Sequence, residues 1–178
     1  MAANIAPGMK RSFMAFKWDH LIDRKIWNDC YEEAKDMVDR SVQVQLQGFD
    51  NNPEMIKLAK QNARFAGVEQ MIQFETRDIK ELSHNGSYGF IITNPPYGER
   101  LEEKANIPPL YRMIGERFKN LSTWSLYLIT SYEGAENDIG RKADKNRKIY
   151  NGMMKTYYYQ FMGPRPPKKA QAVRKDEK

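Results

Sequence analysis

The chain has 178 residues, of which 40% are hydrophobic, a length and composition that suit one globular core. Its 29 basic and 23 acidic residues give a net charge of +6. A single cysteine, Cys30, excludes an intrachain disulfide, and with only two histidines, His20 and His84, a zinc site is not expected. No apolar stretch is long enough to cross a membrane and the first residues lack the apolar core of a secretory signal, so we expect a cytoplasmic protein with no membrane partner.

The first predicted elements are a helix and a strand. Apolar residues at helical spacing predict an amphipathic helix over 18–39, with Trp18 and Trp27 on its apolar stripe as core residues without a catalytic role. Alternating apolar and polar residues over 42–49 predict a half-buried strand that ends at Asp50. A carboxylate at that place can accept hydrogen bonds from both hydroxyls of a ribose.

A second helix follows this strand directly. Asn52 is the expected N-cap, Pro53 takes the first helical position, Glu54 favours the helix dipole and Gly67 is a natural terminator. The order of strand, acid and helix indicates an α/β fold. An acid in such a turn is also commonly just a cap, so the unit alone does not establish a cofactor site.

The next strand is predicted over 71–76 and is followed by Asp78 and Ile79. An acid just past a strand end can accept a hydrogen bond from the amino group of an adenine, while an apolar neighbour covers the face of the ring. The alternative is a surface loop containing an ion pair between Arg77 and Asp78.

An apolar run over 90–93 then leads into Asn94, Pro95, Pro96 and Tyr97, which indicates a buried strand ending in a stiff polar corner. Open α/β sheets bind ligands at the carboxyl ends of their strands. The side-chain oxygen of Asn94 and the carbonyl oxygen of Pro95 are two acceptors for the hydrogens of an exocyclic base amine, and the two prolines fix their positions. Tyr97 offers a ring on which an extruded base can stack.

The same corner has a plain alternative, in which two prolines close a strand and the asparagine is a turn residue. By itself the tetrapeptide leaves the two interpretations near even. The acids that follow the two preceding strands, Asp50 and Asp78, favour the ligand site. Together these residues predict methylation of an exocyclic nitrogen on a nucleobase.

The rest of the chain predicts one more helix and an antiparallel end. A helix is expected over 110–121, after two prolines, and a buried strand over 124–130. Residues 148–161 predict a hairpin that turns at Asn151 and Gly152, a strong signal for a type I′ turn.

Positive charge gathers at two places. The Pro- and Lys-rich tail over 163–178 is expected to be disordered; it could hold RNA phosphates by salt-sensitive attraction or act as a solubilising end without a partner. A second basic cluster comes just before the hairpin and is the better candidate for RNA contact, on the condition that it lies on the ligand side of the fold: Arg141, Lys142, Lys145, Arg147 and Lys148.

These motifs together resemble a known family. The chain is similar to the class I, S-adenosylmethionine-dependent guanine-N2 methyltransferases of large-subunit ribosomal RNA, a THUMP-containing group also labelled as N6-adenine-specific DNA methylases. The segments that carry the resemblance span nearly the whole chain: 4–8, 48–50, 62–68, 92–101, 140–145 and 150–152. General base-amino methylases share only the Asn-Pro-Pro-Tyr core of the run over 92–101, so its extension favours ribosomal RNA over DNA.

The resemblance implies a Rossmann-like class I methyltransferase fold, a mostly parallel α/β sheet ending in an antiparallel hairpin, with a partial catalytic domain over 1–162. The family's glycine-rich loop and first strand have no counterpart, since no Gly-x-Gly occurs in this sequence. The family's sheet order, 3-2-1-4-5-7-6, makes that strand central, and its loss would separate strands 2 and 4. We therefore expect the C-terminal part of a longer protein that carries the first strand and a THUMP domain, or, less simply, a chain complemented by a second one.

The implied reaction is methyl transfer from S-adenosylmethionine to N2 of a guanine in 23S ribosomal RNA. The alternatives are adenine-N6 methylation and a non-catalytic RNA-binding or interaction fragment. The candidate residues are Asn94, Pro95, Pro96 and Tyr97 for catalysis, Asp50, Asn51, Asp78, Ile79 and Asn94 for the cofactor, and Arg100, Arg141, Lys142 and Lys145 for RNA.

Overall fold

The computed structural model describes residues 3–96 and 104–167 of the chain. It divides into two compact units, Met1–Arg77 and Asp78–Lys178, and each is considered by itself. None of the described helices is both long and apolar enough to span a membrane.

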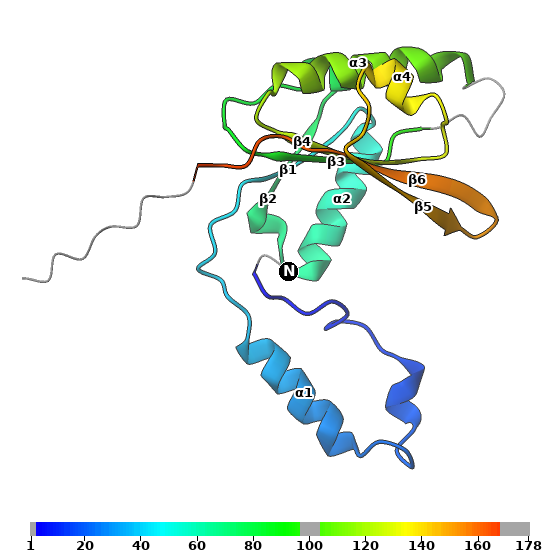
Figure 1. Ribbon diagram of the computed structural model, residues 1–178. Coiled ribbons are helices and arrows are strands. Elements are labelled where there is room, and N and C mark those ends of the chain that lie inside the picture. Colours follow the sequence, from blue (N-terminus) through cyan, green and yellow to red (C-terminus); the bar gives the residue numbers. More distant parts are fainter. Residues whose placement is uncertain (1–2, 97–103, 168–178) are drawn as a thin grey trace, which may run out of the picture. The chain divides into compact units, whose positions relative to one another are not determined.

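The first unit is built around a parallel pair of strands, β1 and β2, which are in register from Leu46 opposite Ile72 to Asp50 opposite Thr76. Helix α2 packs on both strands (Figure 1). The elements of this unit are η1 Met14–Lys17, α1 Arg24–Asp36, β1 Leu46–Asp50, α2 Pro53–Ala66, η2 Glu69–Met71 and β2 Ile72–Thr76.

Helix α2 has the ends that the sequence predicts. The Oδ1 atom of Asn52 accepts the backbone N–H of Glu54 at 2.9 Å, and Pro53 occupies the first helical position. Gly67 ends the helix in the left-handed conformation at φ 74°, where its N–H donates to the last carbonyls. Each signal acts within a few residues, so local chemistry alone sets both ends.

The helix expected over 18–39 is wrong in extent. It starts only at Arg24, because Asp23 caps it by accepting the N–H of Lys25 at 2.7 Å, and it ends at Asp36. Trp18 lies outside the helix with 46% of its surface exposed, so it is not the core residue that the apolar stripe predicts. The ring of Trp27 packs against Phe16 at 5.0 Å, and α1 buries none of its own residues completely.

The second unit holds a four-stranded sheet in the order β3-β4-β6-β5. Strands β3 and β4 are parallel, whereas β6 runs antiparallel to both β4 and β5. The elements are η3 Ile79–Glu81, β3 Phe90–Thr93, η4 Lys104–Asn106, α3 Ile107–Asn120, β4 Ser125–Thr130, α4 Ala135–Ile139, β5 Lys145–Asn151 and β6 Met154–Phe161.

One face of this sheet carries the core. Leu126 and Leu128 of β4, with Tyr159 and Phe161 of β6, pack against α3 and α4, which lie over this face (Figure 1). Side chains alternate along a strand, so the facing residues of β4 and β6 come at every second position. The short helix α4 was not expected from the sequence.

The hairpin formed by β5 and β6 turns one residue later than predicted. Asn151 pairs with Met154, so the two loop residues are Gly152 and Met153 instead of Asn151 and Gly152. Gly152 has φ 60° at the first loop position, which is the glycine placement of a type II′ turn.

The two sheets are separate, as the family's strand order predicts when its central strand is missing. Strand β1 pairs only with β2, and β3 pairs only with β4, among the residues described. The strand predicted over 90–93 forms as β3, but the expectation that it is buried is wrong: none of its residues is buried, and Phe90 is 64% and Ile92 81% exposed.

Candidate functional site

The first candidate group is the carboxylate of Asp50, the last residue of β1. Its Oδ1 atom accepts the backbone N–H of Asn52 at 2.8 Å, which orients the side chain, and Asn51 between them is exposed. The cap of α2 is Asn52 and not Asp50, so capping does not account for this acid. Both carboxylate oxygens keep lone pairs for ligand hydroxyls.

The second group lies at the start of the other unit. Asp78 caps the short turn η3, its Oδ1 accepting the N–H of Lys80 at 2.9 Å. The ion pair with Arg77 that the sequence allows is not formed, since Arg77 binds Glu75 at 2.7 Å. Ile79 is half-buried and packs against the core under α3, so only part of its side chain is open to a ligand.

The third group is the corner after β3. Thr93 pairs with Leu128 of the neighbouring strand β4, so the chain leaves the sheet at Asn94, at the carboxyl end of β3. Asn94 is exposed whereas Pro95 is buried, and Pro96 is exposed again. A buried proline beside an exposed amide fixes the backbone while leaving the acceptor open to a ligand. Tyr97 and Arg100 lie outside the described residues.

A polar network that the sequence did not reveal runs from the buried end of β4 to the surface. Thr130 Oγ1 hydrogen-bonds the hydroxyl of Tyr111 at 2.5 Å and accepts the backbone N–H of Tyr132 at 3.0 Å. The Tyr132 hydroxyl donates to Asp138 at 2.5 Å, and Arg112 binds the other carboxylate oxygen at 2.9 Å. The network ties α3 and α4 to the carboxyl end of β4, next to the strand that carries Asn94.

The charge of Asp138 also acts on its tyrosine partner. The carboxylate accepts the hydrogen bond from the Tyr132 hydroxyl, and this bond, with burial, raises the pKa of Tyr132 above its ordinary value. Tyr132 therefore stays a neutral donor at physiological pH. No sequence signal could have found this pair, because it depends on the placement of α4.

The basic cluster does not lie together at the carboxyl edge. Arg141 is held near the opposite end of β4, since its guanidinium binds Asp144 and the carbonyl of Met162, each at 2.9 Å. Lys142 follows it, and Lys145 pairs with Gln160, which is opposite Tyr127. The cluster thus extends along β5, and its members nearest the level of Asn94 are Arg147 and Lys148.

A family model described as the RMKL-like methyltransferase domain matches residues 1–160. The chain belongs to this methyltransferase family. It is 40% identical over 167 residues to YpsC of Bacillus subtilis, a candidate RNA methyltransferase, and 35% identical over 158 residues to the ribosomal RNA large subunit methyltransferase K/L of Shewanella baltica.

Solved structures agree with this assignment. SMU.472, a candidate methyltransferase solved in complex with SAH, superimposes with a TM-score of 0.86 at 38% identity and 93% coverage of this chain. A candidate methylase from Clostridium difficile 630 gives 0.87 at 46% identity, again over 93% of this chain. The fold is therefore that of class I methyltransferases, as the resemblance implied.

The chain is shorter than these relatives. It spans 43% of YpsC, 22% of the Shewanella methyltransferase and 44% of each of the two solved chains.

Proposed function

We propose that this chain is part of an S-adenosylmethionine-dependent RNA methyltransferase that modifies N2 of a guanine in 23S ribosomal RNA. The observation that carries the proposal is the exposed amide of Asn94, set beside buried Pro95 at the carboxyl end of β3, in a member of a methyltransferase family. The ribosomal RNA methyltransferase among its relatives supports RNA as the substrate, and a cytoplasmic location goes with that substrate.

Each unit, taken by itself, carries a carboxylate whose chemistry suits one part of the cofactor. The oriented carboxylate of Asp50, with Asn51 beside it, would take the ribose hydroxyls, and Asp78 with the open part of Ile79 would take the adenine. When bound, S-adenosylmethionine supplies an electrophilic methyl group. The neighbour that holds SAH at 38% identity supports this assignment.

The chain's own task is to position the amine. Asn94 Oδ1 and the Pro95 carbonyl would each accept one hydrogen of the exocyclic amine, so that its lone pair points along the line of displacement. As the new N–C bond forms, the amine becomes acidic and releases a proton to solvent, so a strong general base is not required. Pro96 stiffens the corner, and Tyr97 would stack on the extruded base.

The longer protein would complete the site. We propose that the rest of the longer protein supplies the family's first strand, its glycine-rich loop and a THUMP domain. The share of the relatives that this chain covers supports this arrangement. Arg100, Arg141, Lys142 and Lys145 remain predicted RNA contacts, with Arg141 already engaged by Asp144.

The first test is calorimetric titration of S-adenosylhomocysteine into the 178-residue chain and into its Asp50→Ala variant. Binding that the substitution abolishes would support the cofactor site. Binding that survives it unchanged would refute the role of Asp50.

The second test is methyl transfer by the full-length protein to RNA containing guanine or adenine at the target. Asn94→Ala is expected to lower turnover far more than cofactor affinity. Transfer to adenine only would favour the adenine-N6 alternative, and RNA binding without any transfer would favour a non-catalytic module.

A further inference from the structure

The hairpin of β5 and β6 extends past the carboxyl end of β4, which is also the end of the sheet at which Asn94 follows β3. Thr130, the last residue of β4, pairs with Tyr157, so within the described ranges the β6 residues before Tyr157 pair only with β5. Asn94 follows Thr93, which is level with Leu128. Figure 1 shows the hairpin reaching out beyond the other strands of this sheet.

Four side chains on one face of the hairpin alternate lysine and tyrosine, and two of them, Tyr150 and Lys155, lie past the end of β4. Lys148 is opposite Tyr157, and Tyr150 is opposite Lys155. The Nζ atom of Lys148 lies 5.4 Å from the Tyr150 ring centre, and Nζ of Lys155 lies 4.9 Å from that of Tyr157. We name these four residues the hairpin platform.

The platform is open at Lys148 and Tyr150, whereas Tyr157 is half-buried and packs against the core. Residues two apart share a face, so the platform continues the side on which Tyr159 and Phe161 are buried under the helices. Unlike these two residues, Tyr150 keeps 62% of its surface exposed. An exposed aromatic ring at the end of a strand adds nothing to the core, which favours a role in contact with a ligand.

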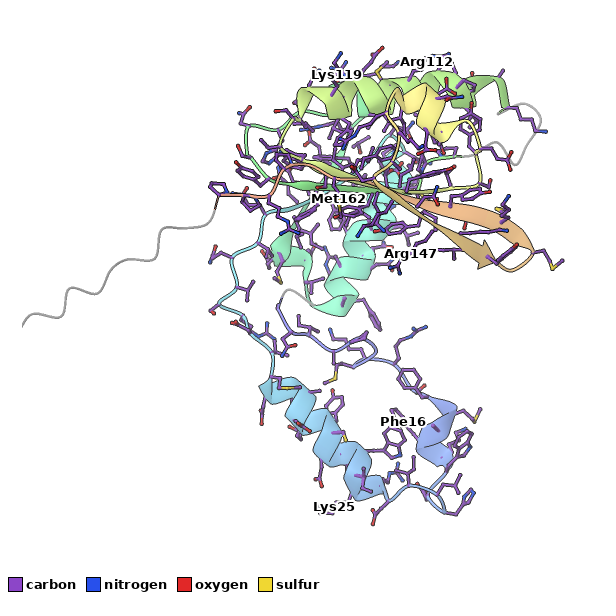
Figure 2. The ribbon with its side chains drawn as sticks, viewed as in Figure 1. Phe16, Lys25, Arg112, Lys119, Arg147 and Met162 are labelled. Atoms are coloured by element: carbon purple, nitrogen blue, oxygen red, sulfur yellow. The ribbon has the colours of Figure 1, made fainter. Side chains whose placement is uncertain are left out.

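The platform is positively charged. Within the described part of the chain, Lys148 has no carboxylate partner, and Lys155 has one, the well-exposed Glu133 at 3.6 Å. A hydrogen bond to Tyr157 raises the pKa of Lys155, so this side chain stays a cation. Arg147, labelled in Figure 2, is on the same strand but one position from Lys148, so it lies on the opposite face and is not part of the platform.

An exposed ring next to lysines, as at Tyr150, matches the chemistry of unpaired nucleotides, because bases stack on aromatic faces and phosphates attract lysines. A duplex keeps its bases stacked inside and offers none to Tyr150. Strand β6 is two strand spacings from β3, about 10 Å across the sheet. Along the strand direction, Lys155 is three residues, about 10 Å, beyond the level of Asn94. This separation suits nucleotides that flank the target base, not the target itself.

We propose that the hairpin platform binds unpaired nucleotides of the RNA substrate, with one base stacked on Tyr150 and the neighbouring phosphates held by Lys148 and Lys155. The inference rests on the proposed function in taking RNA as the substrate. It adds a single-stranded binding site at the hairpin, away from the corner of Asn94 and Pro95.

The test is fluorescence anisotropy of labelled single-stranded oligouridine and of an RNA duplex with the 178-residue chain, without cofactor. Tyr150→Ala is expected to weaken single-strand binding roughly tenfold or more, whereas Tyr150→Phe keeps the ring and stays within about twofold. Lys148→Ala is expected to lower the slope of log affinity against log salt by about 0.7, which Tyr150→Ala leaves unchanged. Lys119→Ala on α3 (Figure 2) removes the same charge elsewhere and serves as the control.

Three results would overturn the platform: no binding of oligouridine at low salt, equal affinity of Tyr150→Ala and the unmodified chain, or duplex bound as tightly as single strand. The assay contains no methyl donor and involves neither Asp50 nor Asn94. Failure of the platform therefore leaves the proposed methyl transfer standing, and failure of methyl transfer leaves the platform measurable.

Discussion

The hydroxyl of Tyr111 on α3 lies 2.5 Å from Oγ1 of Thr130, the last residue of β4, and both side chains are fully buried. Thr130→Val keeps the shape but removes the oxygen that also accepts the N–H of Tyr132. We expect a loss of about 2 kcal/mol in the free energy of unfolding, measured by urea denaturation. Thr130→Ser keeps the oxygen and should lose less; the opposite ranking would contradict a role for the hydrogen bonds.

Gly115 of α3 lies directly against the backbone of α4. A Cβ atom at position 115 would clash with the carbonyl oxygen of Ile139. This oxygen is a backbone atom, so it cannot relieve the clash by changing rotamer as a side chain could. Gly115→Ala should therefore lower the free energy of unfolding by about 1–3 kcal/mol, although alanine favours a helix more than glycine does. Glu116→Ala, at the exposed neighbouring position, is the control, and a Gly115→Ala protein as stable as this control would contradict the expected clash.

Tyr132 should make stability depend on alkaline pH. Its pKa is raised in the folded chain by the hydrogen bond to Asp138, so above pH ~10 the unfolded chain releases this proton more readily. The stabilisation is thus complete at neutral pH and is lost as the pH rises through the folded pKa. Tyr132→Phe should cost about 1 kcal/mol at pH 7–9, with a difference from the unmodified chain that shrinks above pH ~10 in urea titrations. A difference independent of pH would be at odds with this coupling.

Ile92 should promote self-association of the 178-residue chain. It is 81% exposed on β3, whose second edge has no strand partner among the described residues. Ile92→Lys puts a charge on that edge and should reduce concentration-dependent association in analytical ultracentrifugation. Met153→Lys changes a fully exposed residue at the hairpin tip and should have no effect. Equal association of both variants would show that the β3 edge is not responsible.

Local signals explain which elements could be predicted. The ends of α2 follow from Asn52, Pro53 and Gly67, and β3 occupies the apolar run that precedes Asn94. The extent of α1 could not be read in the same way, because the apolar pattern continues upstream of Asp23 although the cap at this residue begins the helix. Likewise, the Asn-Gly signal located the hairpin but not its register, which the pairing of β5 with β6 decides.

The candidate site was predictable where it depends on strand ends. Asp50 is the last residue of β1 and Asn94 follows β3, so both lie at strand ends, as the alternation and the apolar run indicate. The contacts of Arg77 with Glu75 and of Tyr132 with Asp138 could not be predicted from the sequence. Each side chain has several possible partners nearby, and the folded structure determines which one it binds. The hairpin platform could not be predicted, because the two lysine–tyrosine pairs are brought side by side only by the register of β5 with β6.

Burial is shared unequally between the two units. Of the described residues, the buried hydrophobic ones before Arg77 are Ala3, Ile56 and Ala63, while the others lie between Ile107 and Phe161. Opening the strand that ends at Asp50 thus exposes little apolar surface and requires little free energy. Amide hydrogens of β1 should exchange with solvent much sooner than those of β4. A ligand bound by Asp50 would slow that exchange, because it binds only the folded form of the first unit. Part of the ligand's binding free energy would therefore be used to order this unit.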